Sequence, residues 1–267
     1  MRAQPEGTSS AGPARAPLGA NDAELLQAVA GGSEPAFAPD GFIRIGTDGL
    51  VTLVMPQVEM GQGVYTSISA ILAEELDAAW EKVQVEHAPP NEKLYANPFF
   101  GVQVTGNSNS IRAFWTPLRK AGAAARAVLV EAAATRWGAP ASTCRTESGE
   151  VVHAPSGRRL GYGALAAAAA KLPLPKDPAL KDPKDFKLVG KPLKRLDTPD
   201  KVNGRVVYGI DALPPGVKFA TLSQSPVRGG KLVRADEAKA KAVPGVRQVV
   251  LLDDVAAVVG WLRGKVR

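Results

Sequence analysis

The stretch Gln57-Val58-Glu59-Met60-Gly61-Gln62-Gly63 lies between two segments of different periodicity and decides how the chain folds. Before it, residues 42–45 alternate in polarity, residues 46–49 read Gly-Thr-Asp-Gly and residues 50–55 are mostly apolar, which predicts a β-hairpin. After it, apolar residues recur every three or four positions over residues 64–76, which is typical of a helix with one buried face. The stretch is therefore predicted to connect a strand to a helix.

Downstream of this helix the pattern predicts further strands and helices of the same domain. Residues 83–87 alternate as a strand, and a long irregular stretch over residues 89–109 precedes a second helix over residues 111–137. A short hairpin over residues 145–153 and a helix over residues 162–171 follow. Three acidic residues near the end of the first helix are expected on its solvent-exposed side: Glu74, Glu75 and Asp77.

Composition shifts divide the chain into four parts, and the fold class is predicted to be α+β. Residues 1–40 are rich in Ala, Gly, Pro and Ser and are expected to form a flexible leader. Residues 41–171 form the first domain, and residues 172–196, with five prolines and many charges, form an extended linker. Residues 197–267 form a second domain, with strands over 204–211, 217–225, 246–252 and 255–259 and a helix over 235–242.

The turn between strand and helix carries the first candidate site, made of Gly61, Gln62 and Gly63. Glycines let the backbone approach a ligand closely, and the N–H groups at the start of the following helix favour an anion. The Gln62 amide both donates and accepts, which suits it to orient an oxygen ligand. The alternative is that the glycines only make a tight turn. Rossmann-type dinucleotide binding is disfavoured, because Thr66 stands where the third glycine of that fingerprint belongs.

A second candidate site lies just before the long helix, where Thr105, Gly106, Asn107 and Ser108 open the run Thr-Gly-Asn-Ser-Asn-Ser. Short polar side chains and free backbone N–H groups can hold a phosphate through charge-assisted hydrogen bonds. The same residue types are also common helix N-caps, so a capped helix start explains the run without any ligand.

Composition excludes several classes of function. The formal charge of +7 is dispersed, and the densest basic stretch also holds four aspartates, so no nucleic-acid partner is expected. Cys144 is the only cysteine, which is too few for an iron–sulfur cluster. His87 and His153 have no neighbours at ligand spacing, so no metal ligand is predicted. No stretch reaches the roughly 20 apolar residues of a membrane span, and the N-terminus shows no export signal.

Motifs in chain order resemble the large subunits of xanthine oxidase-type molybdenum hydroxylases, and among them the beta subunits of isoquinoline 1-oxidoreductases. The resemblance implies a molybdopterin-binding α/β domain followed by the start of an a/b hammerhead domain. It extends over roughly residues 42–259. The matching motifs are residues 54–76, 85–90, 93–95, 97–98, 105–110, 112–115, 190–192, 195–197, 201–204, 208–211 and 215–220.

The resemblance also implies roles for the candidate residues. Gln62 would hydrogen-bond the oxo ligand of molybdenum, between Gly61 and Gly63, and the residues from Thr105 to Ser108 would hold the pterin or its phosphate. The implied cofactor is molybdopterin cytosine dinucleotide with molybdenum. The implied partners are a small 2Fe–2S iron–sulfur subunit and a cytochrome c as a further electron acceptor. The implied substrates are aldehydes or N-heterocycles, and relatives are commonly periplasmic.

The chain departs from the family in length. Related subunits continue for several hundred residues and carry a glutamate in a Gly-Xaa-Gly-Glu setting, which acts as the base of the hydroxylation; no such motif occurs here. We therefore expect a truncated subunit that contributes part of the cofactor site and is inactive alone. The sequence does not decide whether the chain is itself an enzyme, and the alternative is a non-catalytic interaction module that keeps the fold.

Overall fold

The computed structural model describes residues 36–211 and 215–260. The chain divides into two compact units, residues 1–203 and residues 204–267. Most of the expected leader, up to residue 35, lies outside the described residues. The last part of that leader belongs to the first unit, because Phe37 is buried and forms an antiparallel bridge with Ile45. Order therefore begins before Gly41, which the sequence pattern predicts as its start.

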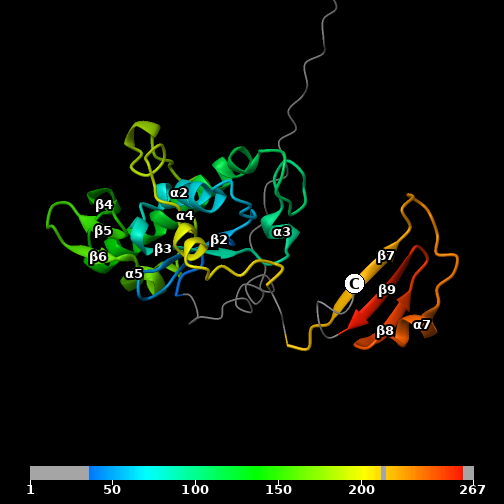
Figure 1. Ribbon diagram of the computed structural model, residues 1–267. Coiled ribbons are helices and arrows are strands. Elements are labelled where there is room, and N and C mark those ends of the chain that lie inside the picture. Colours follow the sequence, from blue (N-terminus) through cyan, green and yellow to red (C-terminus); the bar gives the residue numbers. More distant parts are fainter. Residues whose placement is uncertain (1–35, 212–214, 261–267) are drawn as a thin grey trace, which may run out of the picture. The chain divides into compact units, whose positions relative to one another are not determined.

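The first sheet contains the predicted hairpin. Strands β1 (Ile43–Ile45) and β2 (Val51–Met55) pair antiparallel, and β2 pairs parallel with β3 (Val83–His87), which gives the order β1-β2-β3 (Figure 1). Helix α2 (Val64–Leu76) connects β2 to β3, as the change of periodicity predicted. The candidate turn thus lies between the carboxyl end of β2 and the start of α2.

The rest of the first unit follows the prediction, with several short elements added, two of which change a predicted segment. Helix α3 (Glu92–Tyr95) interrupts the stretch predicted to be irregular, and strand β6 (Arg159–Gly161) extends the predicted hairpin of β4 and β5 to a three-stranded sheet. Both additions are too short to produce a readable period. The remaining elements are α4 (Ser110–Trp137), β4 (Cys144–Glu147), β5 (Glu150–His153), α5 (Tyr162–Ala169), α6 (Thr198–Val202) and the 3-10 helices η1 (Trp80–Lys82), η2 (Ala141–Thr143) and η3 (Pro183–Asp185).

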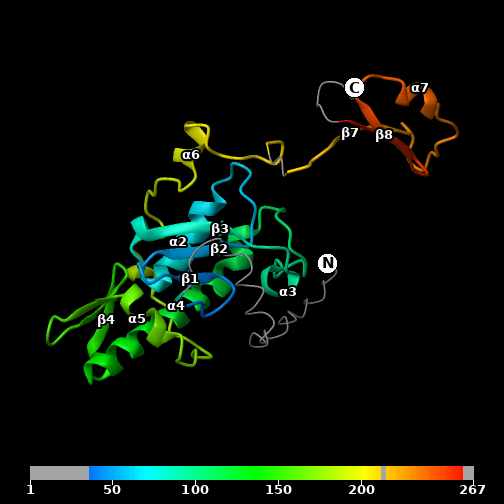
Figure 2. The same cartoon turned by 90° about the horizontal axis from the view of Figure 1, so that it is seen from below.

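Helices α2 and α4 lie side by side and build a large part of the core (Figures 1 and 2). At their contact stands Gly122, where a Cβ atom would lie 2.6 Å from the carbonyl oxygen of Leu72 and 2.9 Å from the Cβ of Glu75. The Ala-rich sequence of α4 allows this close approach. Near its start, α4 also contains Pro117, through which the helix continues.

The acidic residues of α2 contradict the expectation that they face solvent. Glu74 and Glu75 are 1% and 0% exposed, and Asp77 is 7% exposed. The spacing of apolar residues shows which side of a helix faces the core, but the opposite side is exposed only if no other segment covers it. Here residues 177–189 of the expected linker cover that opposite side.

These carboxylates bind the linker through its backbone and its lysines. Glu74 accepts hydrogen bonds from the N–H groups of Lys187, Leu188 and Val189 at 2.8, 2.6 and 3.1 Å, and from Nζ of Lys181 at 3.1 Å. Glu75 accepts from the N–H of Lys181 at 3.0 Å. The segment contains the 3-10 helix η3 and is packed on the first unit, which the prediction of an extended linker did not include. We call residues 177–197 the strap.

Two arginines of α4 complete this attachment. Arg119 donates to Oε1 of Glu75 at 2.7 Å and to the carbonyl of Lys181 at 2.6 Å. Arg126 donates to the carbonyl of Ala179 at 2.8 Å. Glu74 and Glu75 therefore each have cationic and backbone partners, which is the condition under which buried charge is tolerated.

The second unit is a three-stranded antiparallel sheet with one short helix. Strands β7 (Phe219–Gln224), β8 (Val246–Leu251) and β9 (Val255–Gly260) are arranged β7-β9-β8, and α7 (Glu237–Lys241) precedes β8. These elements were predicted. The predicted strand over residues 204–211 is wrong: this segment forms turns and pairs with no strand of the described chain, and its apolar residues, such as Val207, are exposed.

Substituting Gly122 by alanine is expected to destabilise the first unit. The added methyl group meets backbone atoms that cannot move away, and such overpacking costs about 1–3 kcal/mol, against about 1 kcal/mol gained in helix propensity. Urea unfolding followed by tryptophan fluorescence measures the difference. The control is Gly106→Ala, because a Cβ there has no atom within 4 Å; equal midpoints for the two variants would contradict the close contact.

Glu74→Gln is expected to destabilise the first unit in a pH-dependent manner. Burial favours the neutral carboxyl, but hydrogen bonds from the N–H groups of Leu188 and Val189 and the charge of Lys181 outweigh it and hold the pKa of Glu74 below its ordinary value. The ionised form therefore stabilises the fold above the unfolded-state pKa of about 4.3, and this contribution is lost as the pH falls through the lower folded-state pKa.

The variant should lose about 3–5 kcal/mol at pH 7, the usual cost of breaking a buried pair, and much less at pH 3. Urea midpoints at the two pH values test this. The matched control is Glu131→Gln on the exposed side of α4, which should change stability by no more than about 0.5 kcal/mol. A Glu74→Gln deficit that is the same at both pH values would contradict the assignment.

Candidate functional site

The two candidate segments lie together and are joined by Gln57. This side chain is fully buried. Its Nε2 donates to the carbonyl of Val104 at 3.1 Å, and its Oε1 accepts from the hydroxyl of Ser110 at 2.7 Å. The N–H of Val58 donates to Oγ1 of Thr105 at 2.8 Å. The sequence identified both segments, and the structure brings them onto one face of the first unit.

The first segment is a glycine turn that ends at the N-cap of α2. Gly61 and Gly63 have φ angles of 103° and 81°, which only glycine adopts without strain. An added Cβ at either position would meet no atom within 4 Å, so both glycines face open space. The residue between them, Gln62, is exposed.

The Gln62 amide is held by its own turn. Its Nε2 donates to the carbonyl of Val58 at 2.8 Å, and its Oε1 accepts from the N–H of Met60 at 2.5 Å. A primary amide has two N–H donors and two acceptor lone pairs. One donor and one lone pair of Gln62 are therefore left to meet a ligand from a fixed position.

The N–H groups at the mouth of α2 are already bound by Glu59. Its carboxylate accepts from the N–H groups of Gly61, Gly63 and Tyr65 at 2.8, 2.9 and 3.1 Å. Glu59 thus already occupies two of the N–H groups at the helix start, those of Gly63 and Tyr65, where the sequence predicted that an anion could bind. Burial favours the neutral form of this carboxyl, but these three hydrogen bonds and the charge of Arg195 outweigh it and lower the pKa of Glu59.

The strap reaches this turn at its other end. Nη2 of Arg195 lies 3.0 Å from Oε1 of Glu59, and its Nη1 donates to the carbonyl of Gly61 at 3.0 Å. The N–H of Leu196 donates to Oγ1 of Thr66 at 3.0 Å. The strap is thus fixed to both ends of α2.

The second segment has an unusual backbone. Asn107 and Ser108 have φ angles of 54° and 49°, two consecutive residues in the left-handed region. Asparagine tolerates that region better than most residues, which explains how Asn107 occupies it. Two consecutive left-handed residues that are not glycine are costly, and such strained backbone is found mostly at functional sites. An added Cβ at Gly106 would meet only open space.

Two buried asparagines, Asn97 and Asn109, hold the base of this loop. Nδ2 of Asn97 donates to Oδ1 of Asn109 at 3.0 Å, and Oδ1 of Asn97 accepts from the N–H of Phe99 at 3.0 Å. In the described part of the chain, Nδ2 of Asn109 is one of two buried side-chain polar atoms without a hydrogen-bond partner. Polar support of this kind holds a loop in one conformation.

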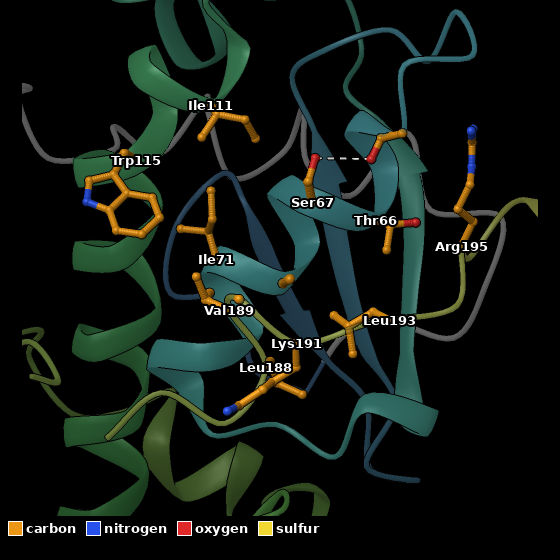
Figure 3. Close-up of a pocket in the computed structure, with 13 residues that line it drawn as sticks. Thr66, Ser67, Ile71, Ile111, Trp115, Leu188, Val189, Lys191, Leu193 and Arg195 are labelled. Atoms are coloured by element: carbon orange, nitrogen blue, oxygen red, sulfur yellow. Dashed lines mark hydrogen bonds between the residues drawn. The ribbon is translucent and has the colours of Figure 1, made fainter. Parts of the chain in front are cut away.

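A cleft of about 380 Å³ opens beside Gly63, between α2, the start of α4 and the strap. Figure 3 shows Trp115 and Ile111 of α4 pointing towards Ile71 of α2, with Leu188, Val189 and Leu193 of the strap opposite them. The dashed line marks the Ser67 hydroxyl, which donates to the carbonyl of Gly63 at 3.0 Å. A smaller cavity of about 90 Å³ lies between the two candidate segments, against Gln57, Val58, Val104 and Thr105.

This arrangement can bind and orient a ligand. It provides an exposed amide, a hydroxyl and a loop of left-handed backbone on one face, supported by buried polar side chains.

Residues 25–212, which are more than half of the chain, match the sequence model of the molybdopterin cofactor-binding domain.

This chain belongs to the molybdopterin cofactor-binding domain family.

Three curated relatives of this molybdopterin-binding chain are named oxidoreductases. The beta subunit of the isoquinoline 1-oxidoreductase of Brevundimonas diminuta is 37% identical over 259 residues, which are 84% of this chain and 33% of that protein. The membrane-bound aldehyde dehydrogenase (pyrroloquinoline-quinone) of Gluconacetobacter polyoxogenes is 34% identical, with 85% and 29% covered. A nicotinate dehydrogenase subunit of Pseudomonas putida is 32% identical, with 82% and 18% covered. The chain spans a third or less of each relative.

Solved structures resemble the molybdopterin-binding chain only weakly. The copper- and molybdenum-containing CO dehydrogenase in its carbon monoxide-reduced state is 21% identical over 47% of this chain and 15% of its own, with a TM-score of 0.37. Reconstituted CO dehydrogenase from Oligotropha carboxidovorans is 22% identical over 52% and 17%, with a TM-score of 0.38. In the described ranges 36–211 and 215–260, no helix of this chain is long and apolar enough to span a membrane.

The residues of the two candidate segments fit a molybdopterin cofactor. Gly61, Gly63 and Gly106 present open space, so a ligand can lie against the backbone there. The hydroxyl of Thr105 accepts from Val58 and keeps its own proton for a further acceptor. At the mouth of α2, by contrast, the Glu59 carboxylate already accepts from the N–H groups of Gly63 and Tyr65.

Sequence reasoning missed three residues that build this site. Gln57 and Glu59 lie inside the quoted stretch, yet their residue types alone indicate no more than polar members of a turn. Arg195 lies 136 positions from Glu59, and no local pattern connects them. The one available signal was that a glutamate two residues before a Gly-Xaa-Gly turn can bind the N–H groups of that turn.

Gln57→Leu is expected to lower the stability of the first unit by about 1–3 kcal/mol, because it leaves the Val104 carbonyl and the Ser110 hydroxyl without this partner. A double-mutant cycle with Ser110→Ala should give a coupling of about 0.5–3 kcal/mol. Glu131→Leu, at an exposed position of α4, is the control and should cost no more than about 0.5 kcal/mol. Additive costs at Gln57 and Ser110 would show that the buried contact is absent.

Proposed function

We propose that this chain forms part of the molybdopterin site of a molybdenum hydroxylase large subunit and is inactive alone. The observation that carries the proposal is the joining of the two candidate segments through Gln57, Val58 and Thr105. In this proposal Gln62 presents its free amide groups to the metal end of the cofactor. When bound, the cofactor supplies the two-electron redox chemistry of hydroxylation.

The loop from Thr105 to Ser108 is proposed to hold the phosphate part of the cofactor. Support comes from its two consecutive left-handed residues, Asn107 and Ser108, a strained backbone of the kind found at ligand sites, and from the open space at Gly106. Because Glu59 already accepts from the N–H groups of Gly63 and Tyr65 at the mouth of α2, we place the anionic part at this second loop and the neutral amide of Gln62 at the other end.

The finer features of the proposal rest on the family and the names of the relatives. We propose the cytosine dinucleotide form of the cofactor, a 2Fe–2S subunit as partner, with a cytochrome c as a further electron acceptor, and an aldehyde or N-heterocycle as substrate. Residues 197–267 are proposed to be the start of an a/b hammerhead domain. The periplasm is proposed as the location of the assembled enzyme.

Cofactor content tests the proposal directly. The chain is produced in a host that synthesises molybdopterin, and the purified protein is analysed for molybdenum and for released pterin by fluorescence. We expect pterin in the unaltered chain and at least tenfold less, about 1.4 kcal/mol of binding, in Gly106→Leu, because the new side chain fills the open space. Ala127→Leu, at an exposed position of α4, is the matched control and should retain pterin.

An unaltered, folded chain without pterin would refute the cofactor proposal and favour a non-catalytic interaction module. Oxidation of aldehydes or N-heterocycles with a dye acceptor, by the chain alone, would contradict the proposed inactivity.

A further inference from the structure

The end of the strap places a guanidinium group directly against the glycine turn. Arg195 contacts both polar parts of this turn: Nη2 meets the Glu59 carboxylate at 3.0 Å and Nη1 meets the Gly61 carbonyl at 3.0 Å. The Glu59 side chain is only 3% exposed. A carboxylate this buried needs a counter-charge, and Arg195 supplies it.

Arg195 is itself held in place by Asp197. The Nε and Nη2 atoms of Arg195 donate to the two carboxylate oxygens of Asp197 at 3.0 and 2.9 Å. Such a two-point contact fixes the plane of the guanidinium group. Lys201 lies 2.5 Å from the same carboxylate and balances its charge. The guanidinium is therefore aimed at the turn before any ligand arrives.

The glycine turn determines where the Gln62 side chain lies. Glu59 binds the N–H groups on both sides of Gln62, at Gly61 and Gly63. The Gln62 amide is tied to Val58 and Met60 within the same turn. A change in the position of the Glu59 carboxylate would thus move the backbone on either side of the amide.

We propose that Arg195 is a positioning residue for Gln62, acting through the Glu59 carboxylate and the Gly61 carbonyl. Its relevance to catalysis rests on the proposed function, since Gln62 is the residue that faces the cofactor there. Arg195 has a second effect on the same site. It cancels the charge of Glu59, which would otherwise repel a phosphate-bearing ligand bound nearby.

Amide hydrogen exchange of the full chain, measured by NMR, tests the positioning role without any cofactor. Arg195→Met should accelerate exchange at Gly61, Gly63 and Tyr65 at least tenfold, because the Glu59 carboxylate loses its counter-charge and leaves these N–H groups. The amide of Leu72, in the middle of α2, should be unchanged. Arg195→Lys, which keeps the charge without the two-point geometry, should restore part of the protection.

The matched control is Lys191→Met, which removes a positive charge from the same strap at a position that lines the cleft. It should leave exchange at the turn unchanged. Unaltered exchange in Arg195→Met, or equal acceleration in the Lys191→Met control, would overturn the inference.

The pterin content of the same variants separates this inference from the proposed function. Loss of pterin in Arg195→Met but not in Lys191→Met supports both. Faster exchange with pterin content unaffected would refute the link from Arg195 to the cofactor site. An unaltered chain without pterin would refute the proposed function, while the exchange result still decides whether Arg195 positions the turn.

Discussion

The first unit depends on carboxylates that bind the strap at the two ends of α2. Glu74 and Glu75 bind its middle through backbone N–H groups and Lys181, and Glu59 binds its end through Arg195. Buried carboxylates without these partners would be costly. Because each carboxylate uses strap groups, the strap belongs to the fold of the unit and forms one wall of the cleft beside the glycine turn.

Much of the fold could be predicted from the period of apolar residues. The helices α2 and α4 and the strands of the second unit have enough residues to show a period, and the short strand β1 could be found because a Gly-Thr-Asp-Gly turn joins it to β2. The charged side of α2 could not be predicted in this way. Residues such as Glu74 are assigned to solvent by default, and their partners lie more than 100 positions later in a segment with no period of its own. The strand predicted over residues 204–211 was wrong because a strand also needs a partner. The segment has apolar residues, but it pairs with no strand of the described chain.

The two segments of the candidate site could be predicted, but the buried side chains that hold them together could not. Glycines and short polar residues have a restricted set of uses, so both segments could be found from residue type. Their contact through Gln57 depends on tertiary structure, which no local pattern encodes. The sequence pattern also did not show that Glu59 binds N–H groups at the start of α2. The same N–H groups that attract a phosphate also attract a carboxylate from the chain. The roles of the individual residues towards a cofactor remain proposals.

Pro117 interrupts the backbone hydrogen bonds of α4 near its start. A proline cannot donate a backbone hydrogen bond, so the carbonyl of Ala113 receives none from position 117. The turn before Pro117 is nevertheless anchored, because Ala113 and Phe114 are buried in the core and the Phe114 ring packs edge-on against Phe42. Side-chain packing therefore holds the start of α4, and with it the end of the polar loop, at the point where the helix lacks one of its own hydrogen bonds.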